Sequence, residues 1–96
     1  MFFVYIIECQ DNSLYTGHTG DLENRMKLHM IGRGARYTRI HRYRRVVYLQ
    51  KFDSRSEAVR REIEIKNMRK DKKMNLVESN MEETSKLLSF MEGRIK

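Results

Sequence analysis

The stretch VYIIECQDNSLYTGHT, residues 4 to 19, has the pattern of a β-hairpin. An apolar run at residues 4 to 7 precedes a polar turn at residues 10 to 13, and a second run follows. Tyr5 and Tyr15 stand ten residues apart, one on each expected strand. Gly17 follows soon after, and glycine weakens the interior of a strand. The pattern predicts that the second strand stops early, at Gly17, and that the tyrosine pair serves more than packing.

The composition is that of one small globular domain. The chain has 96 residues, of which 40% are hydrophobic and 34% are charged, enough for a single modest core. No run of about 18 apolar residues is present, so we expect no membrane span. The N-terminus lacks the basic region of a secretory signal. Cys9 is the only cysteine, which excludes an internal disulfide and favours a reduced, cytoplasmic compartment.

Positive charge is concentrated in the first three quarters of the chain. Residues 1 to 75 hold 17 Lys and Arg against 9 Asp and Glu, whereas residues 76 to 96 hold 3 against 4. An excess of this kind favours a polyanionic partner, most commonly nucleic acid. We expect DNA, with RNA not excluded; the alternative is a soluble domain with a basic surface.

The local patterns predict three strands and a series of helices. Strands are expected over residues 3–9, 13–16 and 46–49, and helices over 21–31, from Ser54 or Ser56 to about 69, and over 71–77. Asn80 and Glu83 resemble a capping box before a last apolar stripe. The order β-β-α-β-α-α favours an α+β fold, a small antiparallel sheet flanked by helices. We assign residues 1–77 to one domain and 78–96 to a helical extension, which either caps the core or joins a second copy.

One carboxylate in the helix that follows Ser54 faces the expected core. At about 100° per residue, Glu62 falls within the arc that contains Ala58, Val59, Ile63 and Ile65. An inward carboxylate needs a cation or a metal ion beside it. Lys66, four residues on, is one candidate partner. A salt bridge at the rim of the core and a metal site are equally compatible with this pattern.

Arg25 and His29 form an i,i+4 pair beside the apolar stripe of the first helix. Arginine can hold a phosphate through two hydrogen bonds at once, and histidine can move a proton near neutral pH. The alternative is that the Arg25 stem lies along the core while its head stays in water.

The connector GRGARYTRIHRYRR, residues 32 to 45, contains six arginines interleaved with aromatic rings. Arginine suits backbone phosphates, and aromatic rings suit unstacked bases. The expected nucleic-acid contacts are Arg33, Arg36, Tyr37, Arg39 and Arg42, together with Lys66. The three histidines are too widely spread to indicate a metal cluster, and no HExxH or Walker motif is present.

Taken in order, these residues resemble the GIY-YIG nuclease family. Phe3-Val4-Tyr5 and Tyr15-Thr16-Gly17 stand where that family has its two tripeptides, and Phe3 replaces the first glycine. Arg25, His29 and Glu62 match the helix-borne residues of the family. The segment from Tyr15 to Leu22 and the connector from Gly32 to Thr38 fit its small single-domain members, which are related to the excision-repair (UvrC) incision domain and to intron-encoded endonucleases. The resemblance covers about residues 2 to 75.

The resemblance implies a three-stranded antiparallel sheet and a one-metal hydrolysis of phosphodiester bonds. Its implied catalytic set is Tyr5, Tyr15, Gly17, Arg25, His29 and Glu62. Glu62 would hold Mg²⁺ or Mn²⁺, Arg25 the scissile phosphate, and Tyr5 the attacking water as general base in a setting that lowers its pKa. Tyr15 would orient water or phosphate, His29 would assist proton movement, and Gly17 would let the backbone turn beneath the site.

Two functions therefore compete. The first is a metal-dependent endonuclease of DNA, with single-stranded or branched DNA as candidate substrates. The second is a weakly active or non-catalytic nucleic-acid-binding module in DNA repair or recombination. The intact residue set favours the first.

Overall fold

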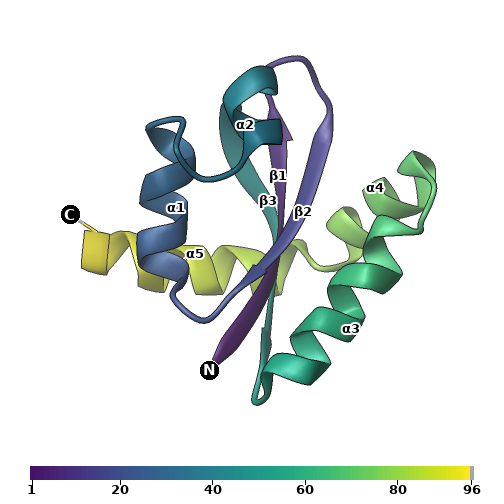
Figure 1. The fold of residues 1–96 in the computed structure, drawn as a ribbon. Helices are drawn as coiled ribbons and strands as arrows, with labels where there is room; N and C mark the ends of the chain where they lie inside the picture. Colours follow the sequence, from purple (N-terminus) through teal and green to yellow (C-terminus); the bar gives the residue numbers. More distant parts are fainter. Residues whose placement is uncertain (96) are drawn as a thin grey trace.

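The computed structural model describes residues 1–95, with side chains through residue 90. The three strands are β1 (Phe2–Cys9), β2 (Leu14–Thr19) and β3 (Tyr43–Phe52), and they form one antiparallel sheet in the order β2-β1-β3. The helices are α1 (Leu22–Met30), α2 (Arg36–His41), α3 (Arg55–Lys66), α4 (Lys70–Ser79) and α5 (Met81–Ile95). Figure 1 shows α1 and α3 on opposite sides of the sheet, with α5 running behind the strands. The predicted α+β fold with a three-stranded antiparallel sheet is confirmed.

The central strand β1 is buried on both faces, and its alternating side chains divide the core into two clusters. Tyr5, Ile7 and Cys9 belong to the cluster on the α1 side, and Val4 and Ile6 to the cluster on the α3 side. All five are 0% exposed. A strand that alternates between two covered faces must be apolar almost throughout, which explains the continuous run that opens the sequence.

Two helices begin where the sequence predicts, each with a side-chain cap. The Asp21 side chain accepts a hydrogen bond from the Asn24 backbone N–H at the start of α1. Ser54 does the same for Glu57 at the start of α3. Each bond satisfies one of the free N–H groups of a first helical turn. After α1 the chain turns at Gly32, whose φ of 77° is a conformation that glycine adopts without strain.

Three local predictions were wrong. β2 does not stop at Gly17, because that residue pairs with Tyr5 inside the strand, which continues to Thr19. The predicted order β-β-α-β-α-α leaves the connector without a helix, whereas its middle forms α2. Among the described residues, Asn80 and Glu83 form no capping-box bond, and the Asn80 amide donates to the Leu49 carbonyl of β3, at 3.2 Å.

The last helix covers an edge of the sheet. β3 is an edge strand, and an edge strand leaves backbone groups that need partners. The Leu49 N–H donates to Thr84 Oγ1 of α5 at 3.1 Å, while Asn80 binds the Leu49 carbonyl. Leu87 and Leu88 pack against the cluster on the α1 side. Along residues 81–90, α5 therefore caps the core, as one of the two alternatives for the extension predicts.

Replacing Thr84 by valine is expected to lower the free energy of unfolding by about 1–3 kcal/mol, because the buried Leu49 N–H loses its acceptor. Urea denaturation measures the change. Ser85→Ala, at an exposed position of the same helix, serves as the control and should leave stability within about 0.5 kcal/mol. Equal effects of the two substitutions would show that this bond contributes nothing specific.

Candidate active site

The Tyr5 ring is buried against the backbone of β2, in space that Gly17 leaves open. A Cβ at Gly17 would lie 2.5 Å from the Tyr5 hydroxyl oxygen and 2.7 Å from Cζ of the same ring. Tyr5 pairs with Gly17 and Tyr15 with Ile7, so the two tyrosines are diagonal neighbours on one face, with ring centroids 6.3 Å apart. Gly17 serves the site by lacking a side chain, and not, as predicted, by turning the backbone.

A chain of hydrogen bonds that starts at the Tyr5 hydroxyl fixes the tautomer and the protonation state of His29. The Thr38 hydroxyl donates to the Ala35 carbonyl, so its oxygen accepts the bond of 2.8 Å from His29 Nδ1–H. The other ring nitrogen, Nε2, then accepts from the Tyr5 O–H at 2.9 Å. His29 is thus neutral, and burial and the charge of Arg25 together lower its pKa to about 4. A proton that leaves the phenol has an acceptor already in place.

Gly34 makes room for the His29 ring as Gly17 does for Tyr5. A Cβ at Gly34 would lie 2.4 Å from His29 Nδ1. The loop between α1 and α2 can therefore close directly over the imidazole and bring Thr38 into contact with it. Gly34 and Thr38 are both in the connector that the sequence analysis singled out, yet neither was identified as a site residue. The Gly-x-x-x-Thr spacing can be read from the sequence, but the contact of both residues with the His29 ring depends on the fold.

Arg25 reaches the same phenol from α1. Its Nε–H donates to the Tyr5 hydroxyl at 3.4 Å. Burial raises the pKa of Tyr5 to about 12, the bond from Arg25 opposes that rise, and the charges of Tyr15 and Glu62 reinforce it. The expectation that the surroundings lower this pKa was wrong: in the free protein Tyr5 is a protonated phenol.

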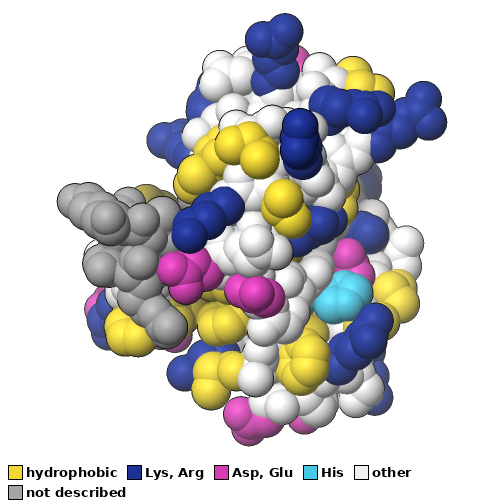
Figure 2. Space-filling view, turned by 60° about the vertical axis from the view of Figure 1, so that its left-hand side comes forward, with side chains coloured by type: hydrophobic (Ala, Val, Ile, Leu, Met, Phe, Trp, Pro, Cys, Tyr) yellow, Lys and Arg dark blue, Asp and Glu magenta, His cyan; other side chains and the backbone are white. Residues whose placement is uncertain are grey.

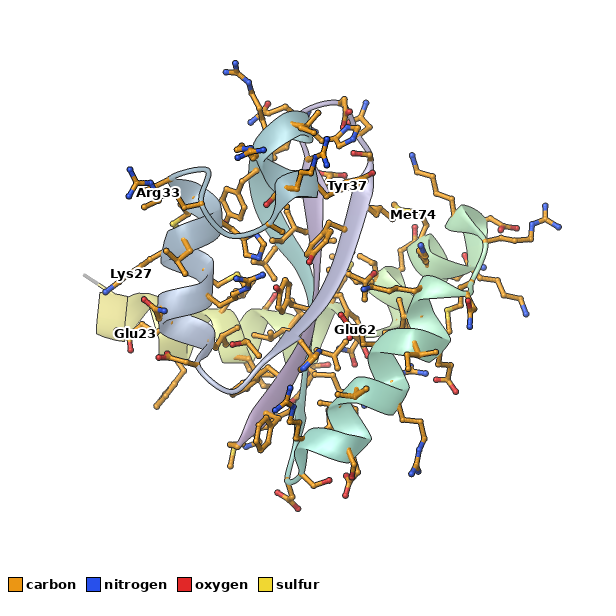
Figure 3. The ribbon with its side chains drawn as sticks, viewed as in Figure 1. Glu23, Lys27, Arg33, Tyr37, Glu62 and Met74 are labelled. Atoms are coloured by element: carbon orange, nitrogen blue, oxygen red, sulfur yellow. The ribbon has the colours of Figure 1, made fainter. Side chains whose placement is uncertain are left out.

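Tyr15 connects this cluster to a stack of rings on α2. Its ring lies 5.6 Å from that of His29 and is stacked on Tyr37 at 5.6 Å. Tyr37 is stacked in turn on His41, with centroids 4.1 Å apart, and His41 is bonded to Asp11 of the hairpin turn. In Figure 3, Tyr37 lies between α2 and β2, consistent with this contact. The stack holds α2 against the hairpin.

Glu62 lies on the other face of β2. Its Oε1 accepts a bond of 2.8 Å from His18 Nδ1, and its Oε2 lies 3.2 Å from Lys66 Nζ. His18 follows Gly17 in the strand, so its side chain points away from Tyr5, toward α3. Figure 3 shows Glu62 directed from α3 toward this strand. The carboxylate is only 13% exposed, as its position in the apolar arc predicts, whereas Ile63 from the same arc is 54% exposed.

The two alternatives for Glu62 overlap in the structure. The salt bridge to Lys66 is formed, but a histidine that the sequence analysis did not assign holds the other oxygen. His18 lies far from Glu62 in sequence, and only the packing of α3 on β2 brings them together. The expected site residues thus form two groups, Tyr5, Tyr15, Gly17, Arg25 and His29 on one side of β2 and Glu62 with Lys66 on the other.

The surroundings of Glu62 suit a hydrated hard cation better than a fully protein-bound one. Among the described residues, no group of three or more His, Cys, Asp and Glu side chains could hold a metal ion. Thr16 lies two positions before His18 on the same face of β2, and its buried hydroxyl has no hydrogen-bond partner within the described part of the chain. One carboxylate and one hydroxyl on the same side of β2 would leave most ligand positions of a cation to water, which fits Mg²⁺, because that ion retains much of its hydration shell.

The connector arginines divide into two kinds. Arg44 and Arg45 both bind Glu8 of β1, so they stabilise the sheet. The predicted nucleic-acid contacts Arg33, Arg36, Arg39 and Arg42 are exposed and have no acidic partner among the described residues. Figure 3 shows Arg33 pointing outward from the loop after α1. Their positive charge is available to a ligand.

Gly17→Ala is expected to lower the free energy of unfolding by about 1–3 kcal/mol, because the new methyl group forces the buried phenol to move. Denaturant unfolding measures the loss, and the tyrosine and histidine NMR signals report whether the Tyr5–His29 bond survives. In Gly20→Ala the new Cβ meets only the edge of the Phe2 ring, at 3.1 Å, so a smaller loss is expected. A variant at position 17 as stable as the wild type would contradict the close approach.

Burial of neutral His29 is expected to make stability depend on pH. Between about pH 6.5 and about pH 4 the unfolded chain takes up a proton that the folded protein excludes, so the free energy of unfolding falls as the pH falls. Above pH 6.5 this contribution is constant. Denaturant titrations at several pH values measure the free energy of unfolding. Over this window it should fall less steeply with falling pH in His29→Gln than in the wild type. Identical slopes for the two proteins would contradict a buried neutral imidazole.

Comparison with known proteins agrees with the resemblance noted in the sequence. Residues 1–75 match the GIY-YIG catalytic domain. A UPF0213 protein of Staphylococcus saprophyticus is 47% identical over 75 residues, which cover 78% of this chain and 92% of the relative. One from Haloquadratum walsbyi is 49% identical over 76 residues, which cover 79% of this chain and 85% of the relative.

A solved structure extends the agreement to the fold. The solution NMR structure of a UPF0213 protein from Bacillus halodurans matches with a TM-score of 0.57 and 43% identity, over 84% of this chain and 87% of the other. The match to the domain spans the hairpin, both faces of β2 and α3, so it includes every residue of the two groups described above. The chain belongs to the GIY-YIG family and contains the catalytic domain of that nuclease family.

Proposed function

We propose that the protein is a divalent-metal-dependent endonuclease that hydrolyses phosphodiester bonds in DNA, with single-stranded or branched DNA as candidate substrates. The observation that carries the proposal is the cluster around the Tyr5 hydroxyl, which donates to a neutral His29 and accepts from Arg25. A packing tyrosine does not need a base on one side and a guanidinium on the other.

Proton movement would pass through Tyr5 to His29. A phenol with a pKa of about 12 is not itself a ready base at neutral pH. Its proton is directed at His29 Nε2, so the phenol can receive a proton from the attacking water as it passes its own to the imidazole. The Nδ1–H bond to Thr38 would hold the ring in position and disperse the charge of the imidazolium.

Arg25 would bind the scissile phosphate. Its guanidinium already lies beside Tyr5, to which Nε donates a long bond, and Tyr15 is a second hydrogen-bond partner. A guanidinium has five N–H groups, so further donors can reach phosphate oxygens. A guanidinium at this place offsets the negative charge that grows in the transition state. Tyr15, half-buried between Tyr5 and Tyr37, would orient the water or the phosphate.

Glu62 is the residue that would hold Mg²⁺ or Mn²⁺, in place of its pair with Lys66. The ion, when bound, supplies Lewis-acid stabilisation of the leaving oxygen. Lys66 is 51% exposed, so its ammonium can turn to a phosphate once the metal ion has replaced it beside the carboxylate. His18 would keep Oε1 of the carboxylate directed at the strand.

The unpaired arginines and Tyr37 would bind the remainder of the DNA. Four exposed guanidiniums that have no acidic partner in the described part of the chain lie on the connector that also carries Thr38, the partner of His29. Contacts of this kind neutralise phosphates and make affinity strongly dependent on salt. Figure 2 shows Lys and Arg side chains gathered at the upper end of the molecule, the end where α2 lies in Figure 1.

A second candidate function is a nucleic-acid-binding module that cleaves weakly. One observation favours it: both oxygens of Glu62 are engaged by basic side chains, which compete with a cation. Such a module would keep the basic connector and lose little if Glu62 were removed.

The endonuclease proposal predicts metal-dependent cutting that two separate substitutions abolish. Labelled single-stranded, duplex and branched DNA are incubated with Mg²⁺, Mn²⁺ or EDTA and analysed on denaturing gels. Glu62→Gln and Tyr5→Phe should each reduce the cleavage rate by at least about a hundredfold, since each removes a group needed in the transition state. Binding of DNA in EDTA should change less than about threefold, because neither residue is a main phosphate contact.

Glu57→Gln, on the exposed side of α3, is the control for a lost carboxylate and should cut like the wild type. Salt-sensitive binding without cutting in the wild type would favour the binding module. Unfolding of Glu62→Gln would instead assign that residue to the salt bridge alone.

A further inference from the structure

A hollow of about 600 Å³ opens beside α2, away from the ring stack. Its walls come from the end of β1, the end of α1, α2 and the start of β3, and it is lined by Gln10, His29, Met30, Ile31, Gly32, Thr38, Arg39, Arg42 and Tyr43. Tyr37 and His41, four residues apart, face β2, whereas Arg39 is turned about 200° from Tyr37 at 100° per residue. α2 therefore separates this hollow from the surface on which Tyr15 and Tyr37 stack.

Backbone bonds fix the wall that carries Arg42. The Gln10 N–H donates to the carbonyl of Arg42 at 2.8 Å, and the Gln10 amide donates to the Tyr43 carbonyl at 3.3 Å. Arg42 ends α2 with a φ of 64°, a left-handed conformation that is uncommon for arginine. The chain thus turns sharply there, and the turn is held by the hairpin next to it.

The charge of this hollow is uncompensated. No Asp or Glu is among the described residues that line it, and neither Arg39 nor Arg42 forms a salt bridge within the part of the chain that the structure describes. Arg44 and Arg45, two and three residues further on, both bind Glu8. Two guanidiniums without an acidic partner among the described residues line the same hollow. Together they are suited to an anion with several oxygens, and a phosphate group has that chemistry.

We propose that this hollow is a second phosphate site, in which Arg39 and Arg42 hold a backbone phosphate of the same nucleic acid that presents its scissile phosphate to Arg25. The inference rests on the proposed function for the identity of the ligand. A strand that fills both sites passes over α2, so a substrate must extend beyond the cleaved bond on one side. His29 and Thr38 line the hollow and also belong to the hydrogen-bond chain of Tyr5, so they report on both sites.

Binding measurements without metal test the proposal independently of cleavage. Arg39→Gln and Arg42→Gln are compared with Arg60→Gln, an exposed arginine of α3 that also lacks a salt bridge among the described residues. The probes are inorganic phosphate, a dinucleotide with a single phosphate, and a longer single-stranded oligonucleotide, in EDTA. NMR amide shifts of Gly32 and Thr38 follow the phosphate, and fluorescence anisotropy follows the oligonucleotide.

We expect phosphate to shift the Gly32 and Thr38 signals in the wild type and in Arg60→Gln but not in the two hollow variants. The longer oligonucleotide should bind about tenfold more weakly to Arg39→Gln or Arg42→Gln, the loss typical of one charge-assisted hydrogen-bonded contact. The dinucleotide, which can reach only one site, should lose less.

Two results would overturn the proposal. Equal losses in all three variants would mean that the arginines act as a diffuse positive surface. Lost phosphate binding with unchanged oligonucleotide affinity would mean that the hollow takes a small phosphate compound instead of the backbone. Cleavage by the wild type is measured separately, so an inactive protein with the expected binding pattern would refute the endonuclease and leave the second site standing.

Discussion

The buried hydrogen bond from the Tyr5 hydroxyl to the neutral imidazole of His29 is the constraint around which the site is organised. Both rings are almost fully buried, and each occupies the place of a missing side chain, at Gly17 and at Gly34. A buried polar pair must be fully bonded to be tolerated. The Thr38 hydroxyl supplies the remaining acceptor, for His29 Nδ1–H, and the need for this bond fixes where the connector crosses α1. The loop, the helix that follows it and the hairpin are thereby held by one network that also performs the proposed proton transfer.

The sequence predicted what depends on neighbours along the chain. The hairpin, the caps at Asp21 and Ser54 and the inward direction of Glu62 all follow from patterns within a few residues. It did not predict what depends on residues brought together by folding. α2 has no apolar stripe of its own and owes its position to ring stacking with Tyr15. His18 became a partner of Glu62 only through the packing of α3, and the role of Gly34 depends on a ring five residues earlier that approaches it in space.

Net charge favours a class of partner but does not distinguish one arginine from another. The arginines of the connector have the same appearance in the sequence, but Glu8 neutralises Arg44 and Arg45, and these belong to the sheet. The described helices include none that is both long and apolar enough to cross a bilayer. Arg33, Arg36, Arg39 and Arg42 have no acidic partner among the described residues, and that difference can be assessed only once the strands are paired.

The register of β1 with β2 places the two halves of the site on opposite sides of one strand. Successive residues of β2 point to opposite faces, so Gly17 faces the phenol while His18 faces Glu62. If β2 were shifted by one residue against β1, the His18 imidazole would lie where the Tyr5 ring now has space. Glu62 would then lose its histidine partner. The phenol and the carboxylate are therefore separated by a single layer of backbone, and the charge of Glu62 still reaches Tyr5 through it. A phosphate bound at the edge of β2 can then be contacted from both faces, which two groups on one face of a flat sheet could not do.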